Sequence, residues 1–178
     1  MSGWTTHTLM STPAMNASRR LTSFLAATLL ALAAVLTCRA EPRPDALIPL
    51  DSFPQSTLEI RSGTRKHTFA IWLAETPEQQ EQGLMFVRDL PENRGMLFVA
   101  AQPRVFNMWM KNTYIPLDMV FIGKDGRIAK IAERTMPHSL ATISSDVPVA
   151  AILEIKGGEA ARRALHAGDV VNWTAPKG

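Results

Sequence analysis

The chain has 178 residues and 46% hydrophobic content, values that are ordinary for one globular domain. Residues 1–40 hold three arginines and no acid, so the 19 basic and 16 acidic residues of the whole chain become 19 − 3 = 16 basic against 16 acidic from Glu41 onward. This balance gives no reason to expect a nucleic-acid partner.

The N-terminal segment is typical of an export signal. Arg19 and Arg20 precede an uncharged apolar run over residues 21–36, and Ala40 ends a stretch suited to signal peptidase. The run is shorter than the roughly 20 residues needed to span a bilayer. We therefore expect residues 1–40 to be an N-terminal extension and a cleaved signal peptide.

Two details of this segment stay open. The chain begins translation at Met1 or at Met15, which lies just ahead of the arginine pair. Cys38 is the only cysteine, and the residues before it loosely resemble a lipobox. We expect a periplasmic or secreted protein after cleavage near Ala40, and the alternative is a lipoprotein anchored through Cys38. The membrane is contacted only through the leader or this lipidation.

A proline-rich linker is expected over residues 41–56, since four prolines there disfavour a helix or a central strand. The rest of the chain, residues 57–178, reads as one domain. If Cys38 leaves with the leader, this domain has no disulfide, no thiol catalysis and no thiolate metal site.

Short strands and two brief helices follow in the domain. Thr76, Pro77 and Gln79 predict a capped helix that ends at Gly83. Gly157-Gly158 opens a second helix, which Gly168 ends. Leu58-Glu59-Ile60 begins the domain, and alternation, apolar runs and an Asp-Gly hairpin turn predict strands at 67–74, 95–100, 105–111, 117–122, 127–131, 149–155 and 170–173.

These elements predict the fold class. Strands joined by hairpins and loops rather than long helices favour antiparallel pairing. We expect a mainly β (α+β) domain, a compact antiparallel jelly-roll-like sandwich or barrel with two short helices.

Seven short motifs follow one another along the domain. They are Gly83-Leu84-Met85, Gly95-Met96-Leu97-Phe98, Met108-Trp109-Met110-Lys111-Asn112-Thr113, Ile115-Pro116-Leu117-Asp118, Asp125-Gly126-Arg127-Ile128, Leu153-Glu154-Ile155 and Gly168-Asp169. Across roughly residues 57–175 these motifs resemble, in their order and spacing, the domain-of-unknown-function 192 (DUF192) family. The resemblance implies a small, mainly β, often exported domain with no assigned activity. Asn107-Met108 and Gly157-Gly158 depart from the family pattern without threatening the fold.

A polar turn is the first candidate site. Lys111 to Tyr114 supply a cation, an amide, a hydroxyl and a phenol, which suit an anionic or sugar-like ligand. Alternatively, Asn112 and Thr113 only fix the turn, and Asp118 is a structural acceptor. With the loop 136–148, the predicted ligand face comprises Arg104, Asn107, Trp109, Lys111, Asn112 and Thr113.

Metal and catalytic sites have weaker support. Met108 and Met110 could hold Cu(I) as thioether ligands, but their strand face also resembles core. Asp118, His138 and Glu154 could form a metal or acid–base site, although no spacing motif joins them. We expect no cofactor and no metal.

The leading hypothesis is thus a non-catalytic accessory or binding module of the cell envelope. Its partner is an unknown envelope ligand or protein. The alternative is a small metal-dependent or acid–base hydrolase that uses Asp118, His138 and Glu154. The sequence leaves the ligand and the oligomeric state open.

Overall fold

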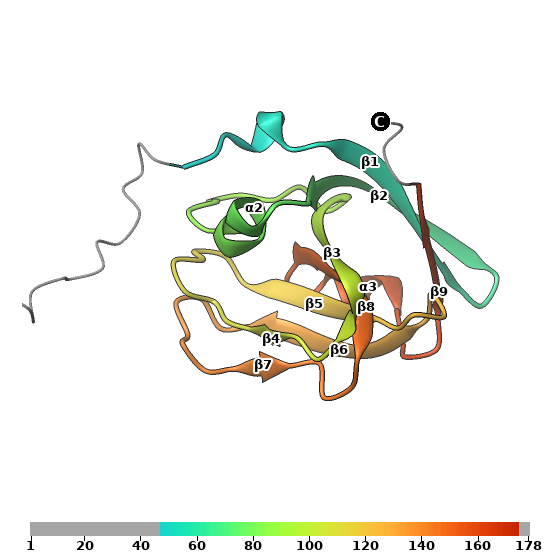
Figure 1. Ribbon diagram of the computed structural model, residues 1–178. Helices are drawn as coiled ribbons and strands as arrows, with labels where there is room; N and C mark the ends of the chain where they lie inside the picture. The colour runs from blue at the N-terminus through green and yellow to red at the C-terminus, as the bar shows by residue number, and fades with distance from the viewer. Residues whose placement is uncertain (1–46, 175–178) are drawn as a thin grey trace, which may run out of the picture. The chain divides into compact units, whose positions relative to one another are not determined.

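The computed structural model describes residues 47–174 (Figure 1). The export signal and the first part of the linker lie outside the described residues. Within residues 47–174, no helix has both the length and the hydrophobicity needed to cross a membrane.

The described residues form nine strands, two short α-helices and one 3-10 turn. In chain order the elements are η3 (Leu50–Ser52), β1 (Gln55–Ser62), β2 (Arg65–Ala74), α2 (Pro77–Gln82), β3 (Arg94–Arg104), β4 (Asn107–Met108), β5 (Leu117–Ile122), β6 (Ile128–Thr135), β7 (Ile143–Ser144), β8 (Val149–Lys156), α3 (Glu159–Arg163) and β9 (Val170–Trp173).

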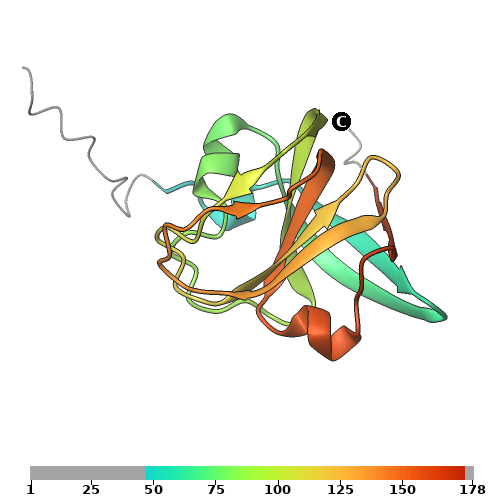
Figure 2. The same ribbon diagram turned by 90° about the horizontal axis from the view of Figure 1, so that it is seen from below.

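Seven of these strands make one curled sheet in the order β6-β5-β8-β3-β2-β1-β9 (Figure 2). Its two edges approach each other, because Arg127, just before β6, forms a bridge with Val170 in β9. The Val171 amide also donates to the Gly126 carbonyl at 2.7 Å. The curl therefore closes partway into a barrel, which confirms the predicted mainly β class with two short helices. The strands β4 and β7 form a separate two-stranded ribbon.

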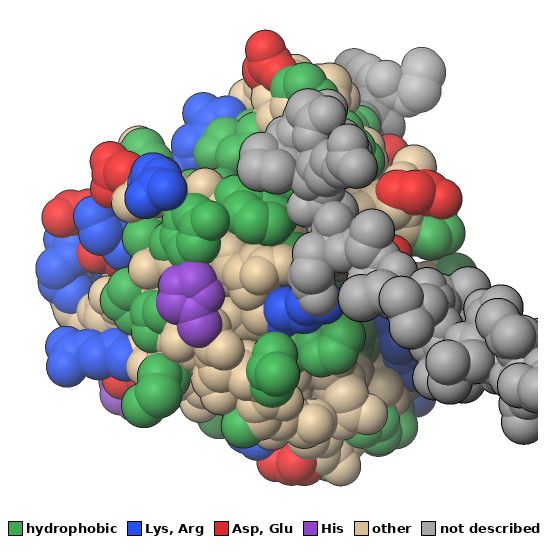
Figure 3. All heavy atoms as spheres, turned by 90° about the vertical axis from the view of Figure 1, so that its left-hand side faces the viewer, with side chains coloured by type: hydrophobic (Ala, Val, Ile, Leu, Met, Phe, Trp, Pro, Cys, Tyr) green, Lys and Arg blue, Asp and Glu red, His purple; other side chains and the backbone are tan. Residues whose placement is uncertain are grey.

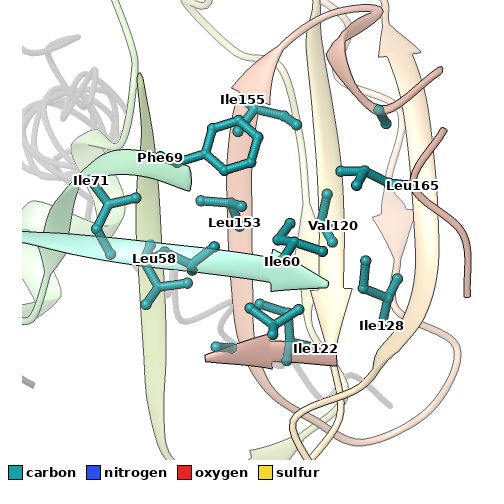
Figure 4. Packing of buried hydrophobic residues seen from close by; sticks show 14 of the residues in the cluster. Leu58, Ile60, Phe69, Ile71, Val120, Ile122, Ile128, Leu153, Ile155 and Leu165 are labelled. Carbon is teal, nitrogen blue, oxygen red and sulfur yellow. The ribbon is translucent and has the colours of Figure 1, made fainter. Parts of the chain in front are cut away.

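Each face of the sheet carries its own hydrophobic cluster. The first cluster gathers residues from the strands of the curled sheet, including Leu58, Phe69, Val120 and Leu153, and Leu165 covers one end (Figure 4). This is the pattern expected for the inside of a closed sheet, where alternate residues of every strand point inward. The second cluster covers the opposite face.

The second cluster is built from strand residues together with residues of the loops and of η3. It positions the loop end of the molecule, because the loops that carry candidate residues contribute its outer members. Its fully or nearly fully buried members are Phe53, Trp72, Ala74, Leu84, Leu90, Met96, Phe98, Phe106, Met110, Leu117, Met119, Phe121, Val149 and Ile152.

Local signals in the sequence account for several elements. The Thr76 hydroxyl accepts from the Gln79 amide, and the Gln79 side chain accepts from the Thr76 amide, so the predicted capping box is present. The predicted Asp-Gly turn joins β5 and β6, with Gly126 at φ +73°.

The structure differs from the sequence prediction in its pairing and in one strand. β2 and β3 are parallel, and α2 lies in the connection between them. The predicted strand 105–111 is reduced to the two residues of β4. Outside β4, backbone groups of this segment bond to loop residues: the Phe106 amide donates to the Ser145 hydroxyl and the Met110 amide to the Ser139 carbonyl.

The second helix and the linker also differ from expectation. α3 ends at Arg163, because the next residue, Ala164, has a φ of +48°, so the helix stops before Gly168. The end of the predicted linker packs on the domain: Phe53 is buried, and the Ile48 amide donates to the Gln82 side chain at 2.7 Å. β1 already begins at Gln55, because these prolines precede the strand rather than interrupt it.

Candidate functional site

Three loops meet at one end of the domain, and we call their surface the loop face. They are residues 83–93 after α2, residues 109–116 between β4 and β5, and residues 136–142 between β6 and β7. In Figure 1 they lie together at the left.

Backbone hydrogen bonds join the three loops directly. The Phe86 amide donates to the Asn112 carbonyl at 2.8 Å, and the His138 amide donates to the Thr113 carbonyl at 3.2 Å. The Met110 amide donates to the Ser139 carbonyl at 2.9 Å. The turn that begins at Lys111 and the loop that begins at residue 136 therefore form one surface.

Each of these loops also holds a residue in the left-handed region. Phe86, Asn112 and His138 have φ values of 64°, 55° and 60°. For residues other than glycine this conformation costs about 1 kcal/mol or more, and such costs gather at functional sites. The inter-loop hydrogen bonds offset this cost by holding each loop in place.

Aromatic rings line the middle of the loop face. Tyr114 lies edge-on to Phe86, with ring centroids 5.8 Å apart, and 5.2 Å from His138. The Arg88 guanidinium lies 4.8 Å from the centroid of the Tyr114 ring. A cation and three rings thus share one continuous surface.

Large apolar side chains are exposed on the same loops. The exposed fractions are 51% for Trp109, 74% for Met136 and 69% for Leu140. The Lys111 ammonium lies 5.9 Å from the centroid of the Trp109 ring. Figure 3 views the molecule from the side on which α2 and these loops lie, and hydrophobic side chains gather there around a histidine and several cations. Exposed apolar groups rimmed by charge mark binding surfaces.

The predicted ligand residues fall into two groups. Trp109 is exposed and Lys111 and Asn112 are half-buried on the loop face, whereas Thr113 is buried and its hydroxyl donates to the Lys111 carbonyl at 3.3 Å. Arg104, at the end of β3, and Asn107, in β4, form the second group: both are exposed, and neither belongs to the three loops of the loop face.

Asp118 has a structural role, as the alternative interpretation of the sequence held. Its buried carboxylate accepts hydrogen bonds from the backbone amides of Arg134, Gly158 and Ala160 at 2.7 to 3.0 Å. It joins the end of β6 to the first turn of α3, where a negative charge complements the helix dipole.

Glu154 is buried without such partners. Its exposed fraction is 5%, and its carboxyl oxygens are not among the fully buried, unbonded polar atoms of the described residues, which are His67 Nε2, Trp72 Nε1 and Arg94 Nε. Burial raises the pKa of Glu154 to about 8, with no other cause contributing. The carboxyl therefore holds its proton at neutral pH.

The predicted catalytic trio is not brought together. Glu154 in β8 pairs with Met119 in β5, so these two side chains share a face of the sheet. Asp118 precedes Met119 in β5 and therefore points to the opposite face from Glu154. His138 is exposed on the loop face. In the part of the chain that the structure describes, no group of three or more His, Cys, Asp or Glu side chains is placed to hold a metal ion. This arrangement gives no support to the hydrolase alternative.

Met108 and Met110 differ in burial but pack at the same hydrophobic cluster. Met110 is fully buried, and its sulfur accepts a hydrogen bond from the Thr135 hydroxyl at 3.0 Å. Met108 is half-buried in β4. Met110 is a member of the second cluster and Met108 packs against it, which agrees with the interpretation of this strand face as core.

Sequence reasoning missed Phe86 and Arg88 as members of the loop face. The one available signal was the apolar run directly after the helix stop at Gly83, which has to pack against something. Nothing in the local pattern indicates that its partner is Tyr114, because the two rings are 28 positions apart in the sequence (114 − 86).

Solved structures that are similar to this chain include the following two. One, from Sinorhizobium meliloti 1021 and described as a candidate transcription regulator, is 41% identical, with a TM-score of 0.67, and the match covers 68% of this chain and 95% of that one. The other, a protein of unknown function from Novosphingobium aromaticivorans DSM 12444, is 35% identical, with a TM-score of 0.68, and the match covers 75% of this chain and 94% of that one.

No curated protein matches the chain. The family model of DUF192, described as an uncharacterized family, matches residues 58–173. Of the described residues 47–174, the match leaves out only residues 47–57 and Thr174. The chain belongs to the DUF192 family.

Proposed function

We propose that this chain is an exported, non-catalytic binding module of the cell envelope, and that its ligand lies on the loop face. One observation carries the proposal: Trp109 is 51% exposed, and its loop is held in place by hydrogen bonds to the two neighbouring loops. A large exposed aromatic side chain on an ordered surface is a typical binding anchor.

The chemistry of the loop face favours an anionic saccharide. Flat aromatic surfaces pack against sugar rings, and Trp109 and Tyr114 provide two of them. The Lys111 ammonium lies over the Trp109 ring and the Arg88 guanidinium over the Tyr114 ring, and both supply positive charge for a carboxylate. Acidic glycans of the cell envelope combine both features.

The leader motivates the envelope location. The arginine pair and the short apolar run indicate export, and the balanced charge after Glu41 gives no basis for extending the description of the Sinorhizobium protein to this chain. The intact mass of the processed protein from its native host tests this part. A chain beginning at Glu41 is expected, and an unprocessed chain in the cytosol would contradict export.

Binding is tested by titrating the processed protein with peptidoglycan fragments that carry free carboxylates. We expect the thermal unfolding midpoint to rise with ligand concentration, because the ligand binds only the native state. Trp109→Ala and Lys111→Ala should each lower the affinity by about tenfold or more.

Controls separate the loop face from general charge effects. Lys124→Ala removes an exposed cation from the β5–β6 turn and should leave the affinity unchanged. A neutral chito-oligosaccharide should bind more weakly than the acidic fragment. Equal affinities of the wild type and of Trp109→Ala would overturn the proposal.

A further inference from the structure

The exposed surface continues from the loop face onto the segment before it, residues 104–109. Val105, Asn107 and Trp109 are exposed, and the residues between them are buried or half-buried. Successive side chains of an extended chain point to opposite sides, so these three exposed side chains lie in one row. Trp109 belongs both to this row and to the loop face.

Arg104 places a positive charge at the far end of the row. Its guanidinium lies 3.8 Å from the centroid of the Phe106 ring, and the buried Phe106 belongs to the second cluster. This contact holds the side chain against the segment. None of the ion pairs within residues 47–174 involves Arg104, so its charge is available to a ligand. We call Arg104, Val105 and Asn107 the β4 row.

Polar groups that suit sugar hydroxyls lie in the same row. The exposed Asn107 side chain carries two N–H donors and a carbonyl acceptor. Asn107 in β4 lies opposite Ser144 in β7, and opposite residues share a face. The Ser144 hydroxyl accepts from the Asp146 amide at 3.0 Å, which holds it in place and leaves its own proton to donate.

The charge of this surface favours an acidic ligand. Residues 95–117 carry Arg104 and Lys111 and no acid. Asp146, which follows β7, is paired with Lys130 at 2.7 Å. A positive potential therefore extends from the loop face along β4 to Arg104.

We propose that the β4 row is a second subsite for the ligand of the loop face, and that this ligand is a chain of acidic sugar units rather than a single unit. The inference rests on the proposed function, because the first part of the chain lies on the loop face. A second carboxylate of the chain pairs with Arg104, and Asn107 bonds to hydroxyl groups between the two carboxylates.

The separation of the cations sets a minimum length for the ligand. The Arg104 guanidinium lies over the Phe106 ring, and the Lys111 ammonium lies over the Trp109 ring. An extended chain rises about 3.3 Å per residue, so residues 106 and 109 are about 10 Å apart. This distance exceeds the width of one pyranose ring. The two carboxylates must therefore come from different sugar units.

The test compares glycan fragments of peptidoglycan that have one or two disaccharide units and free muramic acid carboxylates. Calorimetry on the protein purified from its host gives both affinities, and their ratio is the readout. We expect the two-unit fragment to bind about tenfold more tightly, because it adds a charge-assisted hydrogen bond. Two identical repeats on a single subsite would gain only about twofold, from the doubled number of binding positions.

Three variants assign this gain to residues. Arg104→Ala should lower the ratio to about twofold, and Asn107→Ala should lower it part of the way. Trp109→Ala should lower both affinities and keep the ratio, because both fragments occupy the loop face. Arg65→Ala is the matched control: Arg65 is an exposed arginine at the start of β2, and its loss should change neither affinity.

The outcomes separate this inference from the proposed function. If both fragments bind the wild type with a ratio of about two, the loop face binds the saccharide and the second subsite is overturned. An unchanged ratio in Arg104→Ala would overturn it as well. If neither fragment binds, the proposed function fails, and the second subsite fails with it.

Discussion

Individual buried carboxylates show how this domain handles charge in its interior. Burial alone would raise the pKa of Glu159, but hydrogen bonds from Arg162 and Arg163 hold it below its ordinary value. Asp118 relies on backbone amides instead. Glu154 has neither kind of partner and stays protonated.

Removing the Asp118 carboxylate should destabilise the domain strongly. Asp118→Ala leaves the amides of Arg134, Gly158 and Ala160 without an acceptor, and we expect the free energy of unfolding to fall by about 3 kcal/mol or more. Urea denaturation measures this loss. Asp118→Asn should lose less because it keeps one acceptor oxygen, and equal losses for both variants would contradict the explanation.

Glu154 should make stability depend on pH in a predictable direction. Its pKa is about 8 in the folded chain against an ordinary 4.5, so between these values the folded chain binds a proton that the unfolded chain releases. Its contribution to the free energy of unfolding is full below pH 4.5 and falls as pH rises towards 8, by at most about 1.4 kcal/mol per pH unit.

Glu154→Gln removes this titration. The variant should therefore become more stable relative to the wild type as pH rises from about 5 to about 8. Urea denaturation in the absence of metal, at several pH values, measures the difference. Two pH profiles that run parallel across this range would show that the carboxyl is not buried as the structure has it.

Only some of these residue roles could be predicted from the sequence. The structural role of Asp118 was one of two interpretations of its turn. The burial of Glu154 was not predicted, because an acid in an apolar strand usually marks a solvent-facing side. Here both faces of β8 are covered. No local sequence pattern predicts that the loops of the second cluster cover the face on which Glu154 lies.

At the scale of elements, close strand contact depends on particular glycines. Gly95 lies opposite Ile155 where β3 meets β8. A Cβ atom at position 95 would lie 2.6 Å from the carbonyl oxygen of Glu154 and 3.0 Å from Cγ2 of Ile155. The first distance involves backbone, which a side-chain rotation does not relieve.

Gly95→Ala should therefore push β3 and β8 apart. We expect the free energy of unfolding to fall by about 3 kcal/mol, the upper end of the usual cost of overpacking a core, because the clash is with backbone. Gly63→Ala is the control: nothing lies within 4 Å of its Cβ position, and only the positive φ of +58° opposes the alanine. Its loss should be about 1 kcal/mol, and a similar loss for both variants would contradict the proposed contact.

Elements with strong local signals were predicted well. The capping box placed α2, and the Asp-Gly turn placed the β5–β6 hairpin. The segment 105–111 was predicted wrongly as a strand, since its alternation reflects burial of Phe106 and Met110 under loops rather than pairing along its length. Alternating burial alone does not distinguish these two cases.

At the scale of the whole domain, the fold class followed from short strands joined by turns. The parallel pairing of β2 and β3 was missed because their connection holds only the six residues of α2 as helix, too short a helix to signal a crossover. The loop face also lay beyond prediction as a unit, since its three loops come from distant parts of the chain.

The central claim is that the loop face binds an acidic saccharide. An NMR titration of the processed, isotope-labelled protein with a carboxylate-bearing peptidoglycan fragment tests it most directly. We predict that amide shifts change over residues 84–92, 109–116 and 136–142 and that the Trp109 indole signal moves with them. Shifts confined to the β1–β2 hairpin, or no shifts at millimolar fragment, would contradict it.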